Sequence, residues 1–280
     1  MGEAVQSLSW PARGSTGSPR AEPDAAHPEP VEGGAAGSLT ASRQGVVEIR
    51  DLHPWNVSPA EAVAIQKRLA AQVILEGAPQ DVRVVAGADI SVGGGRGKGA
   101  VVLLSYPDLQ PLEEQVVEAE LTFPYVPGLL AFREIPVLAE AFRRLSQRPD
   151  LLLVDGQGLA HPRRFGIACH LGLLLDLPTI GCAKSRLVGE HGSLGEEVGS
   201  RTELRDGPEV LGLVLRTRAG VTPVYVSAGH RIGLTEAAEW TLRLCRGYRL
   251  PEPARLAHQA AGGQTVAPAA APVGQQLSML

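Results

Sequence analysis

The stretch LLLVDGQGLAHPRRFG at residues 151–166 decides the fold. Four apolar residues in succession are typical of a strand that is buried on both faces of a sheet. The strand leads into Asp155, and the carboxyl ends of such strands are where open α/β sheets place their ligands. We therefore expect an α/β protein with a functional carboxylate at one edge of its sheet.

Outward from this stretch, the periodicity of the chain changes. Segments 82–93, 99–106 and 113–123 are rich in β-branched residues and read as a three-stranded meander. Beyond them, apolar residues recur every three or four positions, which predicts helices alternating with strands. The result is a mixed α/β sheet with helices on both faces, in the order of a ribonuclease H-like fold.

Capping signals place several helices. Ser58 and Glu61 form a capping box around Pro59, which predicts a helix start. Pro162 is expected to open a second helix and Thr235 to cap a third. Further helices are expected around 138–145 and 252–262, and further strands at 150–155, 179–184, 210–217 and 221–229.

Composition divides the 280 residues into three parts. Residues 1–45 are rich in Pro, Gly, Ala and Ser, and 263–280 carry no charge, so both are expected to be disordered. Residues 46–262 are expected to form one ribonuclease H-like domain. With no apolar run long enough for a bilayer, no signal-peptide pattern and three cysteines without CxxC spacing, we expect a cytoplasmic monomer that does not bind membranes.

The net charge of −4 argues against general attraction to nucleic acid. Within 133–186, however, eight Lys or Arg stand against five Asp or Glu. This window is a candidate face for tracking phosphates, and a solvated helix end with scattered arginines is the alternative.

Two aspartates are candidate metal ligands. Asp89 lies among Gly87 and Ser91 on the polar face of its strand, where a charge is costly unless it is paired or bound to a metal. If its strand neighbours that of Asp155, the two carboxylates converge, and hard oxygen ligands suit Mg²⁺ or Mn²⁺. The alternative is that each aspartate caps a turn or pairs with an arginine.

Three residues near these aspartates could contact phosphate. His161 precedes Pro162 and is expected at a helix entrance, where free N–H groups favour an anion, with Arg163 beside it. Lys184 follows a strand and could neutralise developing phosphoryl charge. His230 and His258 are each read as structural on this evidence alone.

The segment FPYVPGLLAFRE at 123–134 is stiffened by Pro124 and Pro127 on either side of Tyr125. An exposed aromatic residue on a rigid loop is what a protein needs to enter a duplex where a base has left the stack. The alternative is a rigid turn under a core tyrosine.

These stretches, together with VAGADISV, VYVSAGHRIGL and GYRLPEPARLAH, resemble the successive motifs of the endonuclease V family over roughly residues 50–262. The resemblance implies a DNA-repair nuclease that recognises deoxyinosine in nucleic acid. Such an enzyme would use Mg²⁺, or Mn²⁺ as a substitute, to hydrolyse the second phosphodiester bond 3′ to the lesion, leaving 3′-hydroxyl and 5′-phosphate ends. Inosine-containing DNA, duplex or single-stranded, is the expected partner, and RNA is a possible one.

The resemblance also implies roles for single residues. Asp89 and Asp155 match the metal ligands and Glu134 the third acidic residue, while Lys184 and His258 match residues near the scissile phosphate. Tyr125 matches the strand-separating wedge, and Gly128, Gly156 and Gly181 would let backbone groups close around the base. Three alternatives stay open: an inosine-specific ribonuclease, a non-catalytic nucleic-acid-binding module on the same fold, and a small-molecule hydrolase that uses Cys182 or Lys184 as nucleophile.

Overall fold

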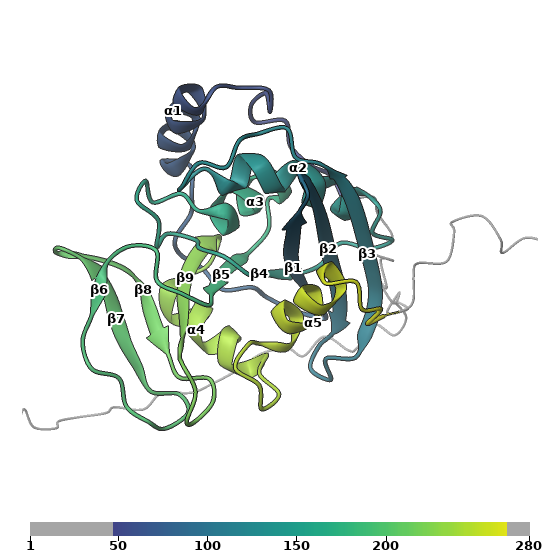
Figure 1. The fold of residues 1–280 in the computed structure, drawn as a ribbon. Coiled ribbons are helices and arrows are strands. Elements are labelled where there is room, and N and C mark those ends of the chain that lie inside the picture. The colour runs from purple at the N-terminus through teal and green to yellow at the C-terminus, as the bar shows by residue number, and fades with distance from the viewer. Residues whose placement is uncertain (1–46, 268–280) are drawn as a thin grey trace, which may run out of the picture. The chain divides into compact units, whose positions relative to one another are not determined.

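The fold is that of a computed structural model, which describes residues 47–267. Through them runs one nine-stranded sheet in the order β3-β2-β1-β4-β5-β9-β8-β7-β6 (Figure 1). β1, β4 and β5 pair in parallel, and all other neighbours in this sheet pair antiparallel. The predicted mixed α/β sheet is confirmed, whereas the predicted extension 1–45 and residues 268–280 of the predicted tail lie outside the described residues.

The elements of the described region follow one another along the chain with these bounds. They are α1 (Pro59–Ala70), β1 (Val84–Gly93), β2 (Arg96–Ser105), β3 (Pro111–Glu120), α2 (Leu130–Arg143), β4 (Leu151–Val154), α3 (Ile167–Leu175), β5 (Thr179–Ala183), β6 (Glu190–His191), β7 (Arg201–Asp206), β8 (Glu209–Leu215), β9 (Val224–His230), α4 (Leu234–Arg243) and α5 (Glu252–Ala261). None of these helices is long and apolar enough to cross a membrane.

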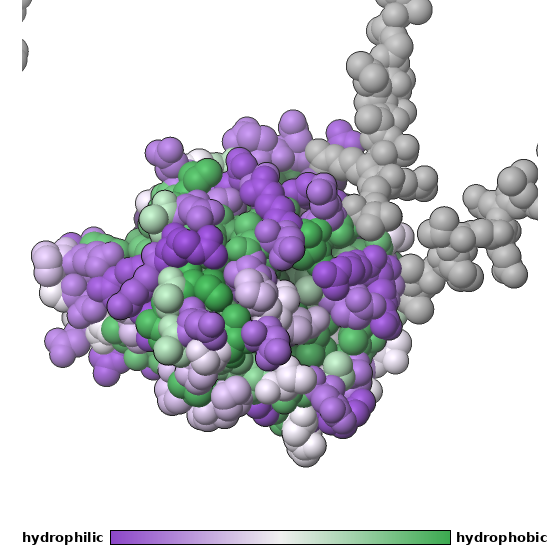
Figure 2. All heavy atoms as spheres, turned by 90° about the horizontal axis from the view of Figure 1, so that it is seen from above, coloured by the Kyte–Doolittle hydropathy of each residue, from purple (hydrophilic) through white to green (hydrophobic). Residues whose placement is uncertain are grey.

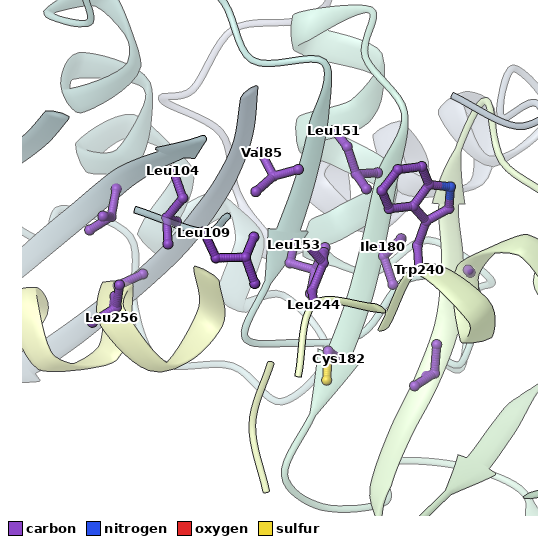
Figure 3. Close-up of a cluster of buried hydrophobic side chains, with 14 of the residues drawn as sticks. Val85, Leu104, Leu109, Leu151, Leu153, Ile180, Cys182, Trp240, Leu244 and Leu256 are labelled. Carbon is purple, nitrogen blue, oxygen red and sulfur yellow. The ribbon is translucent and has the colours of Figure 1, made fainter. Parts of the chain in front are cut away.

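Helices cover both faces of the sheet because successive strand residues point to opposite sides. In β1, Ala86 joins the buried cluster formed with α2 and α3, while Val85 joins the cluster formed with α4 and α5. Figure 3 shows this second cluster, in which Trp240 of α4 and Leu256 of α5 contribute to the same core as Leu153. Each fully buried side chain of this size contributes about 1.5–3 kcal/mol to folding.

The capping box at the start of α1 is present as predicted. The Ser58 side chain accepts a hydrogen bond from the Glu61 N–H at 3.3 Å, and the Glu61 carboxylate accepts one from the Ser58 N–H at 2.7 Å. The helix then buries Ala62, Gln66 and Leu69. A glutamine within an otherwise apolar buried stripe must find hydrogen-bond partners inside the protein.

Two predicted helix starts are wrong. α3 begins at Ile167 rather than at Pro162, because Arg164 lies at φ +55°, outside the helical region, and the backbone turns there. Gly166 is the N-cap of α3, and α4 begins at Leu234 with Gly233, rather than Thr235, as its N-cap.

Two strands, β6 and β7, were not predicted, and the start of one helix, α2, was predicted too late in the chain. β6 and β7 were missed because the RTELRD sequence of β7 buries only Leu204 and so lacks an apolar alternation. α2 begins at Leu130, well before the predicted segment at 138–145. Pro136 lies inside this helix and removes one backbone hydrogen bond, which disguises the helix in the sequence.

Gly87 sets how closely α5 approaches the sheet. A Cβ atom at Gly87 would lie 1.9 Å from the carbonyl oxygen of Pro253, at the start of α5. Backbone therefore packs directly on backbone at this point, and β1 and α5 continue side by side from it. A side chain here would push α5 off the sheet.

We expect Gly87→Ala to lower the free energy of unfolding by about 3 kcal/mol, the upper end for overpacking a core. Gly93→Ala is the matched control, because a Cβ at this position of the same strand meets nothing within 4 Å. Urea unfolding of both variants measures the difference. Equal stability of the two variants would show that α5 accommodates the extra methyl group.

Candidate active site

Three side chains from distant parts of the chain meet at the edge of the sheet. They are Asp89 of β1, Asp155 directly after β4 and His258 of α5, and their ligand atoms all lie within 4.8 Å of one another. The parallel pairing of β1 with β4 brings the carboxylates together, since the Asp155 N–H donates to the Ala88 carbonyl at 3.1 Å. The predicted convergence of the two aspartates is therefore present in the structure.

Hydrogen bonds and an ion pair tie the cluster together. Asp89 Oδ2 lies 2.7 Å from His258 Nδ1, and Asp89 Oδ1 accepts from the Ile90 N–H at 2.8 Å. Lys184, the first residue after β5, forms an ion pair with Asp155 and lies 3.3 Å from His258 Nδ1. The aspartate side chains are only 10–11% exposed, whereas that of His258 is 58% exposed, so the cluster opens to solvent on the side of α5.

Burial and neighbouring negative charge raise the pKa of two acidic groups of the site, Asp89 and Glu134. Burial raises the pKa of Asp89 and the neighbouring Asp155 charge adds to the effect, against the hydrogen bond from His258. Burial, followed by the charge of Asp89, raises the pKa of Glu134 to about 7. Glu134 lies on α2 and is not among the residues whose ligand atoms meet. A concentration of carboxylates that resist ionisation is typical of a site for a cation.

The donor set fits a hard divalent cation. Two carboxylates with one imidazole offer oxygen ligands of the kind that Mg²⁺ and Mn²⁺ prefer, and no thiol is among them. Burial is the first cause of the raised pKa of Asp89, and the charge of Asp155 raises it further, against the hydrogen bond from His258 and the charge of Lys184. The sequence-based metal assignment is thus chemically consistent with the structure.

Tyr125 lies in the loop between β3 and α2 and is 70% exposed. It is therefore not a core residue, which removes the alternative of a turn packed over a buried tyrosine. Gly128 ends the loop at φ +77°, and its carbonyl oxygen accepts three hydrogen bonds, from the side chains of Gln66, His161 and Arg163. The base of the Tyr125 loop is consequently anchored at one carbonyl.

The prediction that His161 lies at a helix entrance is wrong, because α3 begins six residues later, at Ile167, after a turn. The ring is buried, which lowers the pKa of His161 to about 4 and keeps it neutral. Its Nε2–H donates to the Gly128 carbonyl at 3.0 Å, and its Nδ1 accepts from the Arg163 N–H at 3.2 Å. Both ring nitrogens are thus used within the protein.

Most cations of the basic window 133–186 also bind acceptors within the protein. Arg133 and Arg148 donate to backbone carbonyls, Arg143 and Arg144 pair with Glu140, and Arg164 pairs with Asp206 and Glu209. Arg163 binds Gln66 and Gly128, as described above. Among the described residues, Arg186 is the one cation of this window without such a partner. The window is therefore not the open phosphate-tracking face that its charge count indicated.

The three glycines expected around a base are sites of close packing. A Cβ at Gly181 would lie 2.3 Å from the Gly158 nitrogen, and one at Gly156 would lie 2.6 Å from the Ile167 side chain. At Gly128 the corresponding distance is 2.7 Å, to the Arg163 guanidinium. Their lack of side chains lets segments of this chain approach one another, and a role around a base stays a prediction.

Sequence reasoning missed two residues whose hydrogen bonds hold segments of the candidate site in place. Gln66 of α1 donates to the Gly128 carbonyl at 3.1 Å and accepts from Arg163, and the only sequence signal is its position in the buried stripe of the helix. Arg249 donates to the carbonyl of Lys184 and so anchors the backbone that carries this ammonium. Cys182 is fully buried, which raises the pKa of its thiol and excludes it as an accessible nucleophile.

Comparison with known proteins identifies the family. The endonuclease V family model matches residues 67–259. The chain is 56% identical over 212 residues to the endonuclease V of Gloeobacter violaceus, covering 74% of this chain and 86% of that protein. The crystal structure of the endonuclease V from Streptomyces avermitilis is similar at 41% identity and a TM-score of 0.71, covering 78% of this chain and 96% of that one.

A third similar structure contains nucleic acid. It is the endonuclease V of Ciona intestinalis in complex with a 24-mer DNA that contains an inosine followed by a ribo-adenosine. That protein is 30% identical at a TM-score of 0.65, covering 72% of this chain and 95% of that one. The mixed sheet described above is the ribonuclease H-like fold of these structures, and the chain belongs to the endonuclease V family of nucleases.

Proposed function

We propose that the protein is a Mg²⁺-dependent endonuclease that recognises deoxyinosine, the product of adenine deamination, and takes part in DNA repair. It hydrolyses the second phosphodiester bond on the 3′ side of the lesion and leaves 3′-hydroxyl and 5′-phosphate ends. The observation that carries the proposal is the meeting of Asp89, Asp155 and His258 within 4.8 Å, with Lys184 beside them. The inosine-containing DNA bound by the Ciona relative supports the choice of substrate.

In this mechanism Asp89 and Asp155 hold the cation, and Mn²⁺ can replace Mg²⁺. The bound cation supplies charge neutralisation at the phosphate and lowers the pKa of water. The Lys184 ammonium, placed between Asp155 and His258, stabilises negative charge on the pentacovalent phosphate. Glu134, with a pKa of about 7, is suited to orient the attacking water and accept its proton, and His258 holds Asp89 or transfers a proton.

Recognition of the lesion combines a wedge with backbone contacts. Tyr125, stiffened by Pro124 and Pro127, enters the duplex at the position that the inosine leaves. Backbone groups around Gly128, Gly156 and Gly181 then bind the extruded base. Buried hydrogen-bonding groups discriminate strongly between bases that differ by one carbonyl, because the wrong base leaves them unpaired.

Replacing either metal ligand tests the site. We expect Asp89→Asn and Asp155→Asn each to slow cleavage of an inosine-containing duplex by about 10³-fold or more, since the cation supplies several kcal/mol of transition-state stabilisation. Asp108→Asn, at an exposed turn, is the matched control and should cut normally. Normal cutting by either active-site variant would contradict the metal assignment.

The same assay separates the alternatives. Wild-type protein incubated with Mg²⁺ is compared on matched inosine-containing DNA and RNA strands, with EDTA as the control. Faster cleavage of RNA would favour the ribonuclease, and binding without cleavage of either strand would favour a non-catalytic module.

The pKa of Glu134 gives the metal-free protein a pH-dependent stability. Because folding raises this pKa from 4.5 to about 7, the folded state holds the proton more tightly than the unfolded chain. The free energy of unfolding should therefore fall as pH rises from 4.5 to about 7, by about 3 kcal/mol. Asp89 acts in the same direction, because its pKa is raised as well.

Thermal unfolding in EDTA between pH 4.5 and 8 measures this effect. Glu134→Gln should flatten the profile, whereas Glu140→Gln, an exposed position on the same helix, should retain it. Mg²⁺ should restore the stability of the wild-type protein at pH 8. A profile that is the same in all three proteins would contradict the assigned cause.

Tyr125→Ala tests the wedge. Because the side chain is 70% exposed, its removal should leave the melting temperature almost unchanged. Cleavage of duplex inosine should fall about tenfold more than cleavage of the same single strand, because stacking of one aromatic residue contributes about 1–3 kcal/mol. Tyr125→Trp should retain the duplex activity. Equal losses on both substrates would argue against strand separation.

A further inference from the structure

A hollow of about 200 Å³ lies next to the catalytic cluster, over the ends of β1 and α5. Its lining combines strand residues with the last residues of the helix. The lining residues are Ser91, Gly93, Arg96, Lys98, Glu118, Ala261 and Gly262. Nothing in the mechanism above uses this hollow.

The hollow lies close to the Asp89–Asp155–His258 cluster along both β1 and α5. The two elements run side by side, with Gly87 against Pro253 and Asp89 against His258. Ser91 follows Asp89 by two residues on the same face of the strand, a rise of about 7 Å. Ala261 follows His258 by one turn of helix, a rise of about 4.5 Å. The step along β1 is comparable with the spacing of successive phosphates along a nucleic-acid strand.

Lys98 is the cation of the hollow whose ammonium is available to a ligand. It lies directly opposite Ser91 in the β1–β2 register, so both side chains are on the face that carries Asp89. Among the described residues Lys98 has no hydrogen-bond or ion-pair partner. Arg96 donates through Nε to Glu118 at 2.8 Å, which leaves its two terminal nitrogens available. The hollow therefore presents two cations against one carboxylate.

The chemistry of the lining excludes a cation as the occupant and favours an anion. A divalent cation would meet the single carboxylate of Glu118 between Arg96 and Lys98, an unfavourable site. At the end of α5 the N–H groups of Gly262, Gly263 and Gln264 donate to the carbonyls of His258, Ala260 and Gln259, so these three carbonyls already accept a hydrogen bond. Ammonium, guanidinium and hydroxyl groups are together the usual ligands of phosphate.

We propose that this hollow is a phosphate subsite. It binds the backbone phosphate adjacent to the scissile phosphate on the substrate strand through Lys98, Arg96 and the Ser91 hydroxyl. The inference rests on the proposed function, since it takes the scissile phosphate to lie at the Asp89–Asp155 cluster. A second anchored phosphate holds the strand in register, so that one bond at a defined position is presented to the catalytic groups.

The test asks whether removing the charge of Lys98 and removing the charge of one phosphate have the same effect on cleavage. In an inosine-containing duplex, the phosphates on either side of the cut bond are replaced one at a time by neutral methylphosphonates, leaving the cut phosphate intact. Wild-type protein with Mg²⁺ should lose about tenfold in kcat/KM at one of these positions, mainly through KM, since a charge-assisted hydrogen bond is removed. Lys98→Gln should show this tenfold loss already on the unmodified duplex. A methylphosphonate at the position to which the wild-type protein is sensitive should then cause no further loss in this variant.

Lys67→Gln is the matched control, because it removes the same charge from an exposed position on α1 that lies in another part of the fold. It should respond to every methylphosphonate as the wild-type protein does. The salt dependence gives a second measurement: the slope of log K against log salt should fall by about 0.7–0.9 in Lys98→Gln, one phosphate's contribution, and not in Lys67→Gln.

Two results would overturn the inference. In the first, the loss of kcat/KM caused by Lys98→Gln adds to the loss caused by a methylphosphonate at every position. In the second, no methylphosphonate beside the cut bond lowers kcat/KM of the wild-type protein. In both cases normal cutting of inosine DNA by the wild-type protein would leave the proposed function intact. Failure of the wild-type protein to cut inosine-containing strands would overturn the proposed function and the subsite together.

Discussion

The site depends on the parallel pairing of β1 with β4, which places Asp89, within β1, beside Asp155, directly after β4. Neighbouring strands are about 4.8 Å apart, so Asp89 and Asp155 repel one another in a partly buried environment. The surrounding groups offset this repulsion. His258 reaches Asp89 from α5, Lys184 reaches Asp155 from the adjacent strand β5, and Gly87 lets α5 lie close enough for the first of these contacts.

The charge of Asp155 still acts on Asp89 beside these partners. Such negative charge is what a metal ion needs in order to bind. Full neutralisation by fixed cations would leave no affinity for a metal ion. Burial is the first cause of the raised pKa values of Asp89 and Glu134, and the negative potential of a neighbouring aspartate is the second. The same potential opposes folding of the metal-free protein at neutral pH. Stability and catalysis therefore make opposite demands on these carboxylates, and binding of a divalent cation satisfies both.

The sequence predicts those parts of this molecule that depend on local pattern. Asp155 was identified because an apolar strand leads into it, and Asp89 because a charge within a strand is costly unless it is paired or bound to a metal. Ser58 with Glu61 marked the start of α1 through local hydrogen bonds. His161 could not be placed, because its partner is the Gly128 carbonyl, far away in sequence. Gln66 escaped notice for the same reason. Charge counting over 133–186 failed because it does not show which arginines are already paired. Arg143 and Arg144 pair locally with Glu140, whereas the acceptors of Arg148 and Arg164 lie far away in sequence.

The distribution of cations has a consequence for how this protein meets nucleic acid. With a net charge of −4 and most arginines of the basic window engaged internally, there is little uniform positive potential to attract a backbone from a distance. Affinity then has to come from a few placed cations close to the cluster, such as Lys184, Lys98 and Arg186. Contacts of this kind form only when the strand is seated, because each cation reaches a single phosphate. We therefore expect weak non-specific binding. Under the proposed function, the enzyme gains selectivity when it is retained chiefly where an extruded base and the Tyr125 wedge add their own interactions.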